Sequence, residues 1–167
     1  MYDKENKKEK IGVTIRQAST KDSAGFLNLV VALANFEHLD PPDQPARKRM
    51  VYDIFRKKRA KLLMAHSGKM AVGYALYFYT YSSFLARPTL YLEDIFVLES
   101  FRKKGVGKKL FLECVKEAVE NGCGRIEFAV LRWNKNAIKF YEKLGAKRLK
   151  EWYGYRLTRD KLEALVS

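Results

Sequence analysis

The sequence has few of the residues that mark secreted, metal-binding or membrane-spanning proteins. Its 167 residues include only two cysteines and two histidines. Cys114 and Cys123 form no C-x-x-C motif, and His38 and His66 lack metal-ligand partners at useful spacing, so we expect neither a disulfide framework nor a metal. No apolar run approaches the ~18 residues that a membrane helix needs. Residues 1–10 are charged and unlike a signal peptide, so we expect a polar tail on a cytoplasmic protein.

Acidic residues are also scarce relative to basic ones. The chain has 33 lysines and arginines against 19 aspartates and glutamates, a formal net charge of +14. Such an excess indicates either an anionic partner (a nucleic acid, an acidic membrane or a polyphosphate cofactor) or a basic solvated surface. One basic cluster comprises Arg47, Lys48, Arg49 and residues 56–59. Charge alone leaves these alternatives open.

Hydrophobic periodicity predicts one domain in which strands and helices are interspersed. Alternation of apolar and polar residues, or runs rich in β-branched and aromatic residues, predicts strands at residues 11–16, 61–65, 70–80, 90–98, 126–130, 148–152 and 154–157. Apolar stripes at helical spacing predict helices around residues 26–33, 46–59, 107–122 and 137–144, with a last helical turn at 160–166. Several strands followed by alternating helices and strands indicate an α/β (α+β) protein with a single mixed sheet across residues 11–167.

A basic loop with two glycines separates a predicted strand from a long amphipathic helix. Residues 102–107 read Arg-Lys-Lys-Gly-Val-Gly, and Lys108 and Lys109 follow. The glycines let successive backbone N–H groups turn inward, and the following helix adds the positive end of its dipole, so the loop suits a pyrophosphate. An ordinary turn with solvated lysines is the alternative. No G-K-[ST] follows and a third glycine is missing, which excludes the P-loop and the Rossmann fingerprint.

The order of motifs resembles that of the GNAT acetyltransferases over nearly the whole chain, from about Ile15 to the C-terminus. The sharpest similarities are residues 91–97 (YLEDIFV), the loop at 102–107, and residues 133–146, which include Trp133-Asn134 and Phe140-Tyr141. Residues 33–37 (LANFE) are similar to the diamine (spermidine/spermine) acetyltransferases and their thialysine-acetylating relatives. The resemblance implies a mostly antiparallel twisted sheet flanked by helices, acetyl-CoA as cosubstrate and no metal.

The resemblance also implies which residues bind acetyl-CoA. The loop would hold the pyrophosphate, and Asn134 would bind the pantetheine or simply cap the helix that it opens. Backbone groups of Ile95 and Val97 would pair with the pantetheine as if it were another strand. The full set of predicted cofactor-binding residues is Ile95, Phe96, Val97, Arg102, Lys103, Lys104, Gly105, Val106, Gly107, Lys108, Asn134, Ala137 and Tyr141.

Acetyl transfer to an amine needs one group that accepts a proton from the amine and another that protonates the departing thiolate. Glu93 and Asp94 are adjacent acids in an apolar strand, where burying a carboxylate is costly. Successive side chains point to opposite faces unless a bulge intervenes, and an acid at a solvated strand end is the alternative. By resemblance, Glu93 is the general base, acting through water, and Tyr141 is the general acid. The helical stripe of Tyr141 alone would favour a core tyrosine.

A polyamine acceptor needs acidic surroundings, and Glu37, Glu93, Asp94 and Asp40 could form an acidic mouth. The predicted substrate-binding residues are Phe36, Glu37, Glu93, Asp94 and Tyr155. The diamine enzymes carry an acid after the Thr-Tyr of the preceding strand, whereas Ser82 and Ser83 follow Thr80-Tyr81 here. A polyamine, a diamine, a lysine-like molecule and a protein or peptide amine are therefore all hypotheses for the acceptor.

We expect direct transfer in a ternary complex by a homodimer. The dimer is implied by the resemblance and supported by the aromatic residues Trp152, Tyr153 and Tyr155 near the C-terminus. Cys114 belongs to an apolar helical stripe, so no acetyl-cysteine intermediate is expected. Charge alone would favour a non-enzymatic nucleic-acid-binding protein, but the order of motifs argues against it, and neither nucleic acid nor membrane is an expected partner. A CoA-binding regulatory module is the third possibility.

Overall fold

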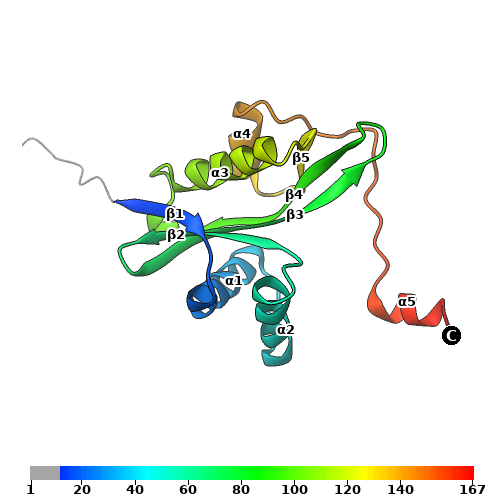
Figure 1. The fold of residues 1–167 in the computed structure, drawn as a ribbon, viewed down its shortest axis with the longest axis horizontal. Helices are drawn as coiled ribbons and strands as arrows, with labels where there is room; N and C mark the ends of the chain where they lie inside the picture. Colours follow the sequence, from blue (N-terminus) through cyan, green and yellow to red (C-terminus); the bar gives the residue numbers. More distant parts are fainter. Residues whose placement is uncertain (1–11) are drawn as a thin grey trace, which may run out of the picture. The chain divides into compact units, whose positions relative to one another are not determined.

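The structure is a computed structural model that describes residues 12–167 (Figure 1). The predicted tail and the first residue of the first predicted strand, Ile11, lie outside the described residues. The described chain forms two compact units, residues 12–129 and Val130–Ser167, which are treated separately below. No described helix is both long and apolar enough to cross a membrane.

The first unit is built on one five-stranded sheet. Its strands are β1 (Val13–Gln17), β2 (Lys61–Ser67), β3 (Met70–Ser82), β4 (Arg87–Val97) and β5 (Arg125–Phe128). They lie side by side in chain order; the first three pairs are antiparallel and β4 pairs with β5 in parallel. The predicted mixed, mostly antiparallel sheet is therefore confirmed.

Helices cover both faces of this sheet. Figure 1 shows α1 (Ser23–Glu37) and α2 (Gln44–Phe55) on one side and α3 (Val106–Glu120) on the other. Short 3-10 turns occur at Thr20–Asp22 and Glu99–Phe101. On the α1 and α2 side, the core consists of Phe26, Leu29, Ile54, Phe55, Leu62, Met64, Tyr74 and Phe96. On α3, Leu110 and Cys114 are fully buried, as their helical stripe predicts.

Helix α2 ends four residues before the end that the sequence predicts. The Asp43 carboxylate accepts a hydrogen bond from the Ala46 amide at 2.7 Å and so caps its start. At the other end, the amides of Arg56 and Lys57 both reach the Tyr52 carbonyl, and Lys58 adopts a positive φ of 53°. This left-handed residue ends the helix and directs the chain toward β2.

A β-bulge interrupts the pairing of β3 with β4. Leu76 lies opposite Asp94 and Tyr77 lies opposite Leu92, so Glu93 is the extra residue. Such a bulge re-aims side chains and breaks strict alternation, so the carboxylates of Glu93 and Asp94 are not forced onto opposite faces. Further along, Gly73 is required because a Cβ there would lie 2.7 Å from the Phe96 carbonyl oxygen.

The second unit contains α4 (Lys135–Lys143) and α5 (Arg159–Ala164), and Gly145, with φ of 90°, follows α4 as predicted. The strands predicted at residues 148–152 and 154–157 are wrong, since the structure has no strand there. All residues from 147 to 167 are exposed. A strand needs a hydrogen-bonded neighbour, and this segment pairs with no other described strand, so its aromatic and branched residues do not produce one.

Candidate active site

The loop at residues 102–107 is shaped as an anion-binding turn. Lys103 and Gly105 have positive φ angles of 59° and 81°, and α3 begins immediately afterwards at Val106. The first amides of α3 have no carbonyl partner within the helix and point along its positive end. Lys103, Lys104 and Lys108 are exposed around this turn. The arrangement can bind a phosphate group through backbone amides and flanking cations.

Arg102 has a different position from the lysines. Its Nε donates to the Val97 carbonyl at 2.8 Å, and its guanidinium lies 4.3 Å from the Phe36 ring centroid and 5.4 Å from that of Phe96. Similarly, Lys104 Nζ donates to the Ser100 carbonyl at 2.7 Å. Arg102 therefore ties the loop to the end of β4 and to α1, and its phosphate-binding role stays a prediction, as do those of Lys103 and Lys108.

One edge of β4 lacks a strand beside the predicted pantetheine-binding residues. Strand β5 pairs only with residues 89–92, whereas β3 pairs with the opposite edge as far as Val97. At Ile95, Phe96 and Val97, that second edge thus has no strand partner within the described part of the chain. An unpaired strand edge presents N–H and C=O groups to an extended amide-containing ligand such as pantetheine.

Three carboxylates gather near this edge. Glu93 is exposed in the bulge, Asp94 is half-buried and Glu37 ends α1. The Tyr74 hydroxyl, on a fully buried side chain, donates to Asp94 Oδ2 at 3.1 Å. The Tyr74 ring is itself held by Phe26, edge-on with centroids 5.1 Å apart. Sequence analysis missed Tyr74, because a tyrosine in a buried strand has no signal that distinguishes a hydrogen-bond donor from a core residue.

Burial and like charges set the protonation of this cluster. Burial raises the pKa of Asp94 to about 6, and the charges of Glu93 and Glu37 act in the same direction while the Tyr74 hydrogen bond opposes them. Burial also raises the pKa of Glu37 and, more strongly, that of Tyr74. Near neutral pH the cluster is therefore anionic, and it would be stabilised by a nearby cation such as a substrate ammonium.

The other predicted site residues belong to the second unit. Asn134 Oδ1 accepts a hydrogen bond from the Ala137 amide at 3.1 Å and so caps α4. Capping is one of the two roles that the sequence suggests for Asn134, the other being pantetheine binding. Tyr141 lies on α4, is only 6% exposed, and its ring centroid is 5.0 Å from that of Phe140. Tyr155 is 93% exposed. The parts that Asn134, Ala137, Tyr141 and Tyr155 play in binding or catalysis stay predictions.

The cysteines have the properties of structural residues. Cys114 is fully buried on α3, and burial raises its pKa to about 12, so its thiolate is suppressed at neutral pH. Burial also raises the pKa of Cys123.

His66 lies 3.2 Å from the carboxylate of Asp22, which also accepts two hydrogen bonds from Arg16. Across residues 12–167, no three His, Cys, Asp or Glu side chains are grouped as metal ligands.

Known acetyltransferases are similar to this chain in sequence. Residues 28–146 match the Acetyltransferase (GNAT) family. The chain is 34% identical to a thialysine N-epsilon-acetyltransferase of Bos taurus over 162 residues, which cover 92% of this chain and 95% of that protein. It is 49% identical to an L-ornithine N5-acetyltransferase of Arabidopsis thaliana over 96 residues, 58% of this chain but only 42% of that protein.

A solved structure supports the fold. An integron cassette protein from the mobile metagenome of V. cholerae superimposes with a TM-score of 0.79, at 21% identity, covering 92% of this chain and 97% of that one. At that identity the likeness speaks for the fold alone. The family match and the thialysine acetyltransferase aligned over 92% of this chain, together with a partial match to a spermidine/spermine N(1)-acetyltransferase-like protein of Homo sapiens, establish that the chain belongs to the Acetyltransferase (GNAT) family, in its diamine acetyltransferase-like branch, and is an acetyl-CoA-dependent N-acetyltransferase.

Proposed function

We propose that the acceptor is the primary amine of a small diamine, polyamine or lysine-like molecule. The carboxylate cluster of Glu37, Glu93 and Asp94 carries this proposal, because it collects negative charge beside the unpaired end of β4. The names of the relatives support it, since ornithine and thialysine both carry a side-chain amine. Between these acceptors, Ser82 and Ser83 favour a lysine-like molecule over a polyamine, because the expected additional acid is missing from that strand.

We propose direct transfer in a ternary complex. The loop at residues 102–107 with Lys108 binds the pyrophosphate, and Ile95–Val97 with Asn134 and Ala137 bind the pantetheine. Glu93 accepts the proton of the substrate ammonium through water, which leaves a lone pair on nitrogen to attack the acetyl carbonyl. The C–S bond then breaks and Tyr141 donates its phenolic proton to the CoA thiolate, while the nitrogen of the new amide loses its second proton, which returns to the Tyr141 phenolate through solvent. An alkyl ammonium has a pKa of about 10, so this deprotonation is required near neutral pH.

We further propose that both units form one acetyltransferase domain and that the protein is a cytoplasmic homodimer. The family match supports the first point because residues 28–146 include parts of both units. Exposed aromatic residues support the second: Trp152, Tyr153 and Tyr155 are 74%, 85% and 93% exposed in the single chain. Apolar surface of this extent is typical of a subunit interface. Sedimentation of only a 19.4 kDa species at micromolar concentration would contradict the dimer.

An amine panel tests the acceptor assignment. CoA thiol release would be followed with acetyl-CoA and ornithine, lysine, thialysine, putrescine, spermidine and an unstructured lysine peptide. We expect the free amino acids and the short diamine to give the highest kcat/KM. A peptide that outperformed every small amine would assign a protein substrate instead, and spermidine as the best acceptor would show that Ser82 and Ser83 do not limit polyamine binding.

A further inference from the structure

A group of basic residues lies on α2 and in the turn that follows it. Residues 44–61 contain eight of the cationic side chains and one acid, Asp53. The cations are Arg47, Lys48, Arg49, Arg56, Lys57, Lys58, Arg59 and Lys61. This segment alone therefore supplies half of the net charge of +14. We call the exposed side of this segment the α2 basic face.

Few of these charges are neutralised locally. Arg59 lies 3.5 Å from Asp53, and Lys61 lies 3.2 Å from Glu117. Lys48, Arg49, Arg56, Lys57 and Lys58 are exposed and have no ion pair with any residue between 12 and 167. A helix C-terminus favours one or two cations, but this accounts only for residues 56–59 and not for Lys48 or Arg49.

An exposed aromatic ring lies within the α2 basic face. Lys48, Tyr52 and Arg56 follow one another at i, i+4 spacing, so they form one stripe, while Ile54 and Phe55 pack into the core. Tyr52 is 52% exposed, and Lys57 Nζ lies 5.7 Å from its ring centroid. A tyrosine between cations provides a surface on which a planar base can stack while its phosphates meet the flanking charges.

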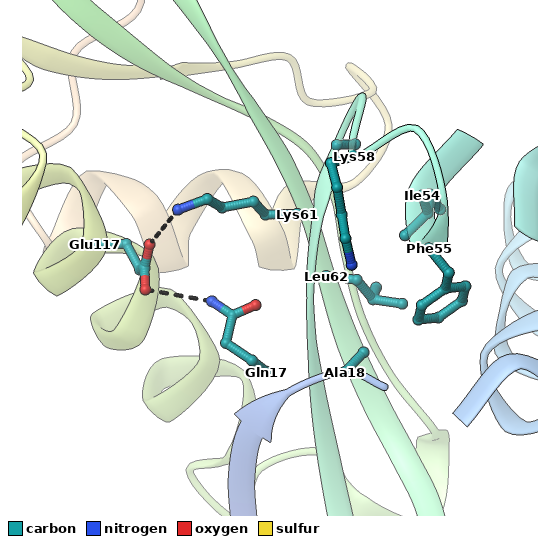
Figure 2. A pocket seen from close by; sticks show the side chains of 9 residues that line it. Gln17, Ala18, Ile54, Phe55, Lys58, Lys61, Leu62 and Glu117 are labelled. Carbon is teal, nitrogen blue, oxygen red and sulfur yellow. Dashed lines mark hydrogen bonds and ion pairs between the residues drawn. The ribbon is translucent and has the colours of Figure 1, made fainter. Parts of the chain in front are cut away.

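The α2 basic face adjoins a pocket of about 480 Å³ where α2 meets the start of β2. Figure 2 shows Lys58 beside Ile54, Phe55 and Leu62, which give the pocket an apolar wall. The opposite wall is polar: in Figure 2, Lys61 and Gln17 both point to Glu117, at 3.2 and 3.3 Å. An apolar surface with hydrogen-bonding groups beside it suits an unstacked base.

We infer that the α2 basic face and the adjoining pocket bind single-stranded RNA, with phosphates on residues 48–58 and a base in the pocket. Single strands fit because bases within a duplex are stacked and cannot enter a pocket, and RNA commonly presents unpaired bases in loops. This inference differs from the sequence-based expectation that nucleic acid is not a partner. That expectation treats nucleic-acid binding as an alternative to catalysis, whereas a separate RNA-binding surface is compatible with a catalytic site elsewhere. Lys61 lies four residues along β2 from Ala65, which is level with Gly73 and Val97 at the loop end of the sheet. The two regions are therefore offset by about 13 Å along the strand direction, and Val97 lies two strands further across the sheet.

Fluorescence anisotropy with a labelled 12-nucleotide mixed-sequence RNA tests this inference. Contact with about four phosphates predicts that affinity falls about 50-fold between 50 and 200 mM salt. The triple variant Arg56→Gln, Lys57→Gln, Lys58→Gln should bind at least tenfold more weakly. Its matched control, Lys147→Gln, Arg148→Gln, Lys150→Gln, removes the same charge from exposed positions elsewhere and should stay within threefold of the wild type. Both should retain acetyl transfer, which keeps this test separate from the proposed acceptor.

Two further variants test the identity of the occupant. Tyr52→Ala removes the stacking surface, and Ala60→Leu narrows the pocket that Ala60 lines. Each should weaken single-stranded RNA binding several-fold and leave the weaker binding of a 12-base-pair duplex unchanged. An equal loss of RNA affinity in both triple variants would show that RNA responds to the overall positive charge and not to the α2 basic face, which would overturn the inference. Binding of polyglutamate or single-stranded DNA as tight as that of RNA, insensitive to Tyr52→Ala and Ala60→Leu, would also overturn it.

Discussion

Loss of the hydrogen bond from Tyr74 to Asp94 should raise the pKa of the Asp94 carboxyl. Tyr74→Phe removes one hydroxyl group and leaves a ring of nearly the same shape between Phe26 and Phe96. The hydroxyl favours the ionised form of Asp94, whose pKa is about 6. A hydrogen bond to a charged group contributes about 1.5–3 kcal/mol. At about 1.4 kcal/mol per pKa unit, its loss should raise the pKa of Asp94 by about one to two units.

The assay is the pH dependence of kcat/KM with the best small amine. If Asp94 binds the substrate ammonium as proposed, only its ionised form does so. Activity should then rise with pH through the Asp94 pKa, near 6 in the wild type and near 7–8 in Tyr74→Phe. At pH 9 the two enzymes should differ little. Tyr77→Phe is the matched control, because it deletes an equally buried hydroxyl that bonds instead with Gln17. An unchanged acid limb in Tyr74→Phe, or an equal shift in Tyr77→Phe, would refute the reasoning.

The remaining predictions concern catalysis, cofactor binding and stability. Tyr141→Phe should lower kcat by about 10²–10⁴-fold and leave CoA affinity, measured by calorimetry, nearly unchanged; wild-type turnover would return Tyr141 to a core role. Gly105→Val should weaken CoA binding about tenfold, roughly 1.4 kcal/mol, because its φ of 81° strains any branched residue, and unaltered CoA titrations would contradict this. Asp94→Asn should raise thermal stability at pH 7 while lowering activity. The pKa of Asp94 in the folded protein, about 6, exceeds the ordinary value of 3.8, so the wild type loses up to about 3 kcal/mol of stability as pH rises between these values. Calorimetry should therefore show a higher Tm for Asp94→Asn than for the wild type at pH 7, and no such difference at pH 4. Cys114→Ala and Cys123→Ala should keep kcat within a few-fold in the thiol-release assay, and an acetylated cysteine in mass spectra would overturn direct transfer.

Sequence patterns predicted the first unit better than the second. The strands and helices between residues 13 and 128 have strong periodicity, because each packs one face against a shared core, so pattern and burial agree. Residues 148–157 contain equally suitable strand residues, yet they are exposed and lack a strand neighbour in the described chain. Strand propensity reports suitability for a sheet and contains no information about whether a partner strand is within reach.

The acidic site shows a second limit. Glu93 and Asp94 are visible in the sequence as acids in an apolar strand, but the bulge that relieves their alternation arises from the pairing of β3 with β4. Likewise, the capping hydrogen bond of Asn134 is a local feature and was among the expected interpretations. The Tyr74 contact joins residues 20 positions apart, so no local pattern contains it. Local chemistry can thus be read from the chain, whereas contacts across the sheet need its register.

Arg102 has a consequence for how the two substrates bind. It contacts Phe36 at the end of α1, next to Glu37, and it also holds the last carbonyl of β4 beside the phosphate-binding loop. A shift of α1 on amine binding would therefore move a side chain that fixes the loop at residues 102–107, which is proposed to bind CoA. Any change that the amine makes in the affinity for acetyl-CoA must equal the change that acetyl-CoA makes in the affinity for the amine. If the amine and acetyl-CoA bind at the proposed sites, Arg102 connects the two binding equilibria through a single side chain.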